Sequence, residues 1–203
     1  MTPYHHGDLK TALLLYAREQ LETASLDALS MREMANAVGV SHSAAYRHFK
    51  DKRALLQAVA TLGFEEMLVS SRGAENAAAA DSRARLRTVG LAYVRFGLMY
   101  PRQLAHMFSA VSDPQASHEL TSAGAELFEL LYQLVCEGQR EKAIRSDDAR
   151  QLAHACWAMV HGLSTLLGIG ALRVRQTDLD AQLLTAEHAL DVFLDGMASR
   201  VKG

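Results

Sequence analysis

A chain of 203 residues is long enough for one or two domains with a buried core. Apolar residues make up 49% of it and charged residues 22%, which excludes a wholly disordered chain. The formal net charge of −2 excludes an overall basic protein, so any binding of nucleic acid must come from a local patch. Three prolines in an Ala- and Leu-rich background predict an all-α protein without a sheet.

The N-terminal third predicts two short helices joined by a tight turn. Ser30 and Glu33 have the spacing of a capping box, which starts a helix after Ser30. Gly39 suits the positive φ of a tight turn, and Ser41 can cap a further helix that begins at once. A longer helix precedes this pair, with Leu9, Leu13 and Ala17 on one face. The range 30–49 is therefore predicted to be a helix, a turn and a helix.

The rest of the chain brings the count to about nine predicted helices. A fourth helix, capped by Asp51, runs past residue 67 into an Ala-rich stretch at 74–80. Helices are then expected after Asp81, over 102–110, up to about Gly138, after Ser146 and after Asp178. We place the domain boundary near the Ala-rich stretch, between an N-terminal domain at 7–67 and a C-terminal domain at 81–203.

A helix that follows a tight turn can lie in the major groove of DNA, with its flanks against phosphates. The helix after Ser41 suits this role, because positive charge concentrates in the range 41–53. This range contains four basic residues, Arg47, Lys50, Lys52 and Arg53, and only one acidic residue, Asp51. Val40, Ala45 and Phe49 are expected to hold the helix against its neighbours. The predicted base contacts are His42, Ser43, Ala44 (against a thymine methyl) and Arg47, and the predicted phosphate contacts are Tyr46, His48 and Lys52.

In order and spacing, these residues resemble the signature of the TetR family of bacterial transcriptional regulators. The similarity runs from about residue 7 to 67 and includes Gly39-Val40-Ser41, Tyr46-Arg47-His48-Phe49 and Ala54-Leu55-Leu56. It implies an all-α homodimer with a DNA-binding domain, a C-terminal ligand-binding and dimerisation domain, and a double-stranded DNA operator as partner. It also implies that Ser30, Tyr46, His48 and Lys52 contact phosphates and that Arg32, His42, Ser43 and Arg47 face bases. The alternative is that residues 47–53 form only a solvated charged face.

A second pattern, Trp157-x3-His161-Gly162, is similar to one C-terminal subclass of the same family. This similarity implies that the last two helices of each subunit form a four-helix dimer interface. The apolar residues available for that interface lie on both helices: Cys156, Met159, Val160, Leu163 and Leu167 on one, and Leu183, Leu190, Phe193 and Met197 on the other.

Aromatic and sulfur-containing side chains of the C-terminal domain could enclose a small apolar effector, since ligand pockets are mostly apolar with a few polar groups. The same residues could equally be plain core. The candidates for ligand contact are Tyr93, Phe96, Tyr100, Met107, Phe128, Tyr132, Trp157 and His161. The resulting hypothesis is a repressor released from a pseudo-palindromic operator by a small apolar effector, of unknown identity.

Three other classes of function fit the sequence less well. The uncharged range 151–172 is long enough to span a membrane, but burial in a dimer explains it better. His154, Cys156 and His161 could belong to a metal sensor or zinc-binding protein, although Cys156 points to another side of the helix. The sequence carries none of the common hydrolase or nucleotide-binding motifs, so neither an enzyme nor a cofactor is expected. Two cysteines and no secretion signal predict a cytoplasmic protein.

Overall fold

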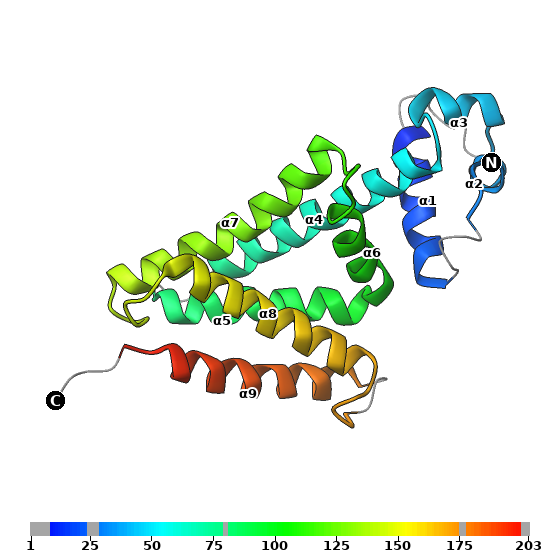
Figure 1. Cartoon of the computed structure of the whole chain (residues 1–203). Coiled ribbons are helices and arrows are strands. Elements are labelled where there is room, and N and C mark those ends of the chain that lie inside the picture. Colours follow the sequence, from blue (N-terminus) through cyan, green and yellow to red (C-terminus); the bar gives the residue numbers. More distant parts are fainter. Residues whose placement is uncertain (1–8, 24–28, 79–80, 175–177, 200–203) are drawn as a thin grey trace. The chain divides into compact units, whose positions relative to one another are not determined.

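A computed structural model describes residues 9–23, 29–78, 81–174 and 178–199. These residues form nine α-helices, and their only β-type pairing is an isolated bridge between Ile144 and Ala198. The predicted all-α fold is therefore confirmed (Figure 1). The helices are α1 (Leu9–Thr23), α2 (Met31–Ala37), α3 (His42–His48), α4 (Lys52–Ala77), α5 (Ser82–Met99), α6 (Pro101–Val111), α7 (His118–Arg140), α8 (Ala149–Gly168) and α9 (Leu179–Met197).

Most helix starts lie where the capping signals predict them. Ser30 and Ser41 accept hydrogen bonds from the backbone N–H groups of the third residue beyond them, at 3.1 and 3.2 Å. Asp51, Asp81 and Asp178 act in the same way at the starts of α4, α5 and α9. These short polar side chains satisfy backbone donors that a helix leaves unpaired in its first turn.

One predicted helix start is wrong. The sequence suggested Ser146 as the cap of the eighth helix, whereas α8 begins at Ala149 with Asp148 as its N-cap. The Asp148 Oδ1 atom accepts hydrogen bonds from the backbone N–H groups of Arg150 and Gln151, at 2.9 and 3.2 Å. Because a carboxylate at this position also complements the helix dipole, it is a stronger cap than a serine two residues earlier.

The chain divides into two compact units. The first contains residues 1–64 and 102–122, and the second contains residues 65–101 and 123–203. Thus α6 and the start of α7 join α1–α3 and the first half of α4. The predicted domains at 7–67 and 81–203 stay a prediction, since a compact unit need not coincide with a sequence domain. Residues 7 and 8 lie outside the described residues.

The first unit is built on a core that α1, α2, α3 and the start of α4 share. Leu13, Ala35, Ala45 and Leu55 are completely buried in it, one from each of these helices. Gly39 makes the turn between α2 and α3 with a φ of +75°, a conformation that costs other residues about 1 kcal/mol or more. The predicted helix, tight turn and helix over 30–49 are confirmed.

In the second unit, α5 packs against both α8 and α9 (Figure 1). Gly90 of α5 lies against the side chain of Leu190, and a Cβ at this glycine would come within 2.7 Å of a Leu190 methyl carbon. The close approach buries Val160 and Leu190 within a single chain. Within the described residues, no helix is both long enough and apolar enough to cross a membrane.

Candidate nucleic-acid interface

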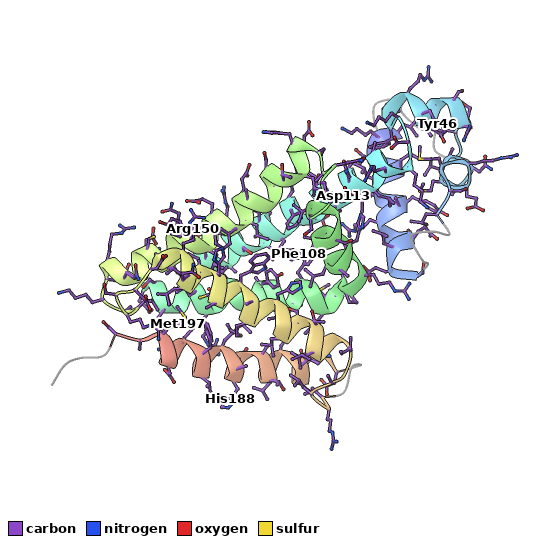
Figure 2. The ribbon with its side chains drawn as sticks, in the orientation of Figure 1. Tyr46, Phe108, Asp113, Arg150, His188 and Met197 are labelled. Carbon is purple, nitrogen blue, oxygen red and sulfur yellow. The ribbon has the colours of Figure 1, made fainter. Side chains whose placement is uncertain are left out.

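Helix α3 separates its side chains into a buried face and an exposed face. Ala44 and Ala45 are buried on it, and Phe49, the residue that ends it, is only 4% exposed. The predicted base- and phosphate-contacting side chains of this helix lie on the exposed face, where Figure 2 labels Tyr46: His42, Ser43, Tyr46, Arg47 and His48. The structure therefore presents these five side chains together, on a helix whose other face packs into the core of the first unit.

One predicted DNA contact is corrected by the burial of its side chain. Ala44 was expected to touch a thymine methyl, but it is only 8% exposed and belongs to the core of the first unit. Its methyl group packs inside the protein, because α3 needs two adjacent small residues to lie against α1 and α2. Ala44 is therefore not part of the candidate interface.

The remaining candidates flank α3. Ser30 is the N-cap of α2, and Arg32 is exposed in the first turn of that helix. Lys52 is the half-buried first residue of α4. Within α3, the rings of His42 and Tyr46 meet edge to face with centroids 4.7 Å apart. At its start, the hydroxyl groups of the N-cap Ser41 and of Ser43 lie 3.1 Å apart. These contacts restrict the rotamers of side chains that would otherwise be free on the surface.

The predicted effector-binding residues form smaller groups. In the second unit, the Tyr93 hydroxyl lies 2.8 Å from Nδ1 of His161, while Phe128 contacts Trp157 at a centroid distance of 6.1 Å. Phe96 and Tyr100 form a third pair, with centroids 5.3 Å apart. Tyr132 instead contacts Arg150, whose guanidinium carbon lies 5.0 Å from the centroid of the Tyr132 ring. Met107 belongs to the first unit, where it is completely buried.

Burial keeps the polar atoms of this region uncharged. Burial raises the pKa of the Tyr93 hydroxyl above its usual value and lowers the pKa of His161. Both side chains are therefore neutral at pH 7, and the hydrogen bond between them joins two uncharged groups. Such a pair can orient a polar group of an uncharged ligand without the cost of burying a charge.

The histidines and cysteine considered as metal ligands have other surroundings. The Cys156 thiol is buried, which raises its pKa to about 12, and it lies 3.6 Å from the sulfur of Met197. The His154 ring stacks on Phe128, at a centroid distance of 4.9 Å. Across the described ranges, no three His, Cys, Asp or Glu side chains lie close enough together to hold a metal ion. The geometry therefore offers the metal-sensing alternative no support.

The interface residues predicted on α8 and α9 lie mostly inside the chain. Six of the nine are buried in the second unit's own core: Cys156, Val160, Leu163, Leu167, Leu190 and Met197. The sequence had not singled out the residues that are exposed on the same two helices. Leu166 and Ile169 are 43% and 66% exposed on and just after α8, and Leu184 and Val192 are 69% and 59% exposed on α9. A dimer built from these helices would therefore use other faces than those predicted.

A helix-turn-helix whose second helix is exposed and basic defines a DNA-binding regulator. Comparison with protein families makes this assignment specific: residues 13–59 match the N-terminal region of bacterial regulatory proteins of the tetR family, and residues 86–193 match a tetracyclin repressor-like C-terminal domain. The chain belongs to the TetR family. It is a DNA-binding transcriptional regulator, and members of this family are transcription factors rather than enzymes.

Solved structures with the same fold cover nearly the whole chain. A protein of unknown function from Rhodococcus sp. RHA1 is 35% identical, with a TM-score of 0.86 over 98% of this chain and 100% of its own. The TetR family regulator PfmR from Thermus thermophilus is 19% identical, with a TM-score of 0.71 over 90% of this chain and 97% of its own. The ketosteroid transcriptional regulator KstR2 of Mycobacterium tuberculosis is 15% identical, with a TM-score of 0.66 over 94% of this chain and 95% of its own. A search of curated proteins gave no match.

Proposed function

We propose that this chain is a homodimeric repressor that leaves a pseudo-palindromic operator when a small, largely apolar effector binds. The observation that carries the proposal is the exposed face of α3, where His42, Ser43 and Arg47 stand together on a helix fixed by a buried core. Arg47 can pair with the O6 and N7 atoms of guanine, while His42 and Ser43 are less selective. Tyr46, His48, Ser30 and Lys52 would hold phosphates, and Arg32 would reach a base edge.

Dimerisation would bring two such faces onto one operator. Five of the nine large apolar side chains that are exposed in the described residues fall between 166 and 192. On α9, Leu184, His188 and Val192 follow at intervals of four and share a side of the helix, and Figure 2 shows His188 on its outer side. A Cβ at Gly162 of α8 would meet open space, which leaves room for a partner helix to approach. These features support a four-helix interface formed by α8 and α9 of two subunits.

The effector would bind in the second unit, which contains the Trp157-x3-His161-Gly162 pattern that is similar to one C-terminal subclass of the family. The hydrogen-bonded pair of Tyr93, which is buried, and His161, which is half-buried, supplies a polar contact among aromatic side chains. To release DNA, the effector must bind the conformation that does not fit the operator more tightly than the one that does, since equal affinity shifts no equilibrium.

The first test measures operator binding directly. Fluorescence anisotropy with DNA from just upstream of the protein's own gene, and with a scrambled control, should show preferential binding to the upstream DNA. If about six to eight phosphates are neutralised per dimer, log affinity should fall against log salt with a slope of about −5 to −7. A slope near zero, or the absence of any DNA affinity after bound ligand is stripped, would overturn the proposal.

Two substitutions separate base contacts from phosphate contacts. Arg47→Ala should weaken binding to the preferred site by about 1–3 kcal/mol and relax discrimination between base pairs, because a bidentate contact to guanine is lost. Lys52→Ala should weaken binding to all sequences alike, because a phosphate carries no sequence information. Binding to a library of single-base operator variants measures both effects. If the two variants gave the same specificity profile, the proposed division of roles would be wrong.

A further inference from the structure

His188 lies at the centre of the exposed side of α9. The helix runs over Leu179–Met197, so His188 is its middle residue. Leu184 and Val192, about one turn before and after it, lie on the same side of the helix. Both are large and apolar, yet both are more than half exposed. Figure 2 shows His188 on the outer side of α9, so a titratable side chain stands between two apolar ones on the face that the proposed dimer would bury.

The acidic side chains beside His188 are held by α5. Arg87 of α5 donates from Nε to the Asp191 carboxylate at 2.7 Å, and its Nη2 atom lies 3.2 Å from the Glu187 carboxylate. The pKa of Asp191 lies below its usual value, chiefly because of its hydrogen bond to Arg87 and in smaller part because of the nearby imidazole of His188. The negative charge next to His188 is therefore already balanced within the subunit.

Helix α8 also packs against α9, but its histidines contact other helices. The His161 ring lies against the Tyr93 hydroxyl of α5, and the His154 ring stacks on Phe128 of α7. The imidazole that a second copy of α9 would meet is therefore that of His188.

Two-fold symmetry decides which residues of two α9 helices can meet. A two-fold axis perpendicular to α9 at His188 places residues that are equally far before and after His188 opposite each other. Leu184 then faces Val192 of the partner subunit, so that both apolar side chains are buried. An axis at Leu184 would bring that residue against its own copy but would leave Val192 without this apolar contact. The pattern of exposed residues on α9 thus favours an axis at its centre.

The acidic residues at the two ends of α9 favour an antiparallel arrangement. Asp195 forms an ion pair with Arg83 of α5, and Asp180 is exposed near the start of the helix. In the antiparallel arrangement Ala181 of the partner subunit lies opposite Asp195, and Gly196 of the partner subunit lies opposite Asp180. In a parallel arrangement each acid would face its own copy, and like charges repel. Both arrangements bring the two central histidines together, but only the antiparallel one keeps the acids apart.

We propose that His188 meets His188 of the partner subunit at the two-fold axis and that this pair makes dimerisation pH-dependent; the inference rests on the dimer of the proposed function. Two neutral imidazoles can share a hydrogen bond, since each has one donor and one acceptor nitrogen. Two protonated imidazoles have only donors, and their charges repel. An imidazole exposed on a free subunit takes up a proton as the pH falls from 8 to 5. The dimer is therefore tightest above about pH 7 and weakens as the pH falls below that value.

Disulfide cross-linking tests the contact itself. Packed helices have axes about 8–10 Å apart and Cα atoms about 2.3 Å from each axis, so facing Cα atoms come within about 6 Å, the reach of a disulfide. In a Cys136→Ser background, which leaves only the buried Cys156, His188→Cys should give a covalent dimer on a non-reducing gel after mild oxidation. Leu184→Cys should not cross-link alone, but should do so when co-expressed with Val192→Cys.

Two results of the cross-linking experiment would contradict the arrangement. If the protein is a dimer at pH 7.5 and His188→Cys does not cross-link, the two histidines do not meet at the axis. If Leu184→Cys cross-links to itself, the two α9 helices are not antiparallel about His188.

Analytical ultracentrifugation at pH 7.5 and pH 5.5 measures the pH dependence. The dimer Kd of the wild-type protein should rise about 10-fold or more at pH 5.5, because two charges about 5 Å apart repel. His188→Gln should have the same Kd at both pH values, because an amide does not titrate. His118→Gln is the matched control, since His118 is exposed on α7 in the first unit, and its dimer should weaken as the wild-type dimer does. Equal pH dependence in His188→Gln and in the wild type would overturn the assignment.

The outcomes separate this inference from the proposed function. A monomer at pH 7.5 would contradict the proposed dimer and the His188 pair together. A dimer whose Kd is the same at both pH values would agree with the proposed function and overturn the role of His188. Circular dichroism of the wild-type protein at pH 5.5 should show unchanged helix content, which distinguishes dissociation from acid unfolding.

Discussion

Replacing Leu184 and Val192 together by glutamate should convert the protein into a monomer and lower its affinity for a two-half-site operator by about 100-fold or more. Both side chains are more than half exposed in the single chain, on one side of α9. Burying each of these side chains in a dimer should contribute about 1.5–3 kcal/mol to the free energy of association, and each subunit supplies one copy of both. The double variant loses this contribution and places like charges across a symmetric interface. Analytical ultracentrifugation would measure the oligomeric state, and anisotropy would measure the affinity.

Val69→Glu is the matched control for the double variant. Val69 is 71% exposed on α4, outside the α8–α9 face, so a charge there should change neither the oligomeric state nor operator affinity. A folded double variant that stayed dimeric would show that the subunits associate through another surface. Loss of operator binding in the control as well would point to general destabilisation rather than to an interface.

The sequence predicted most helix starts correctly, because capping depends on residues that are close in the chain. Ser41, Asp51, Asp81 and Asp178 each bind the backbone N–H group of the third residue beyond them. The prediction failed at Ser146, where Asp147 and Asp148 offered competing caps within two residues. The choice between adjacent caps depends on how the preceding loop reaches the helix, which the local sequence does not specify.

The faces of the helices were harder to predict. On α8 and α9 apolar residues occur on nearly every side, so their spacing cannot tell which side faces α5 and which faces a partner. Leu183 was predicted at the interface, but its neighbour Leu184 is the exposed residue, and one residue turns a helix by about 100°. The exposure of Ala44 was also predicted wrongly. Ala44 and Ala45 are both small and apolar, and the sequence did not show that both are buried.

The complete burial of the Gln103 side chain, in the first turn of α6, could not have been predicted from the sequence. A glutamine at the start of a helix is ordinary, and only its complete burial without a partner distinguishes it. That burial depends on Gly63, which lies 40 residues earlier in the chain and lets α6 approach the backbone of α4. The sequence does mark the start of α6, because Pro101 is the first residue of that helix, where a missing N–H has no cost.

Phe49→Ala should lower the free energy of unfolding of the first unit by about 3–5 kcal/mol. Operator binding should then be lost at temperatures close to the lowered Tm of the variant. Phe49 is 4% exposed, ends α3 and packs in the core that α1, α2 and α4 share. Truncation leaves a cavity beneath the helix that carries the candidate base contacts. Urea denaturation followed by circular dichroism, together with hydrogen exchange of the α1 and α3 amides, would locate the loss in the first unit.

His48→Ala is the control for Phe49→Ala, because His48 is the adjacent residue and is exposed. It should leave the free energy of unfolding within about 0.5 kcal/mol of the wild-type value while weakening DNA binding through the loss of a phosphate contact. The pair therefore separates the two roles proposed for α3, in which one face supports the fold and the other contacts DNA. If Phe49→Ala were as stable as His48→Ala, the core assigned to the first unit would be wrong, and so would the rigid support on which the proposed DNA contacts depend.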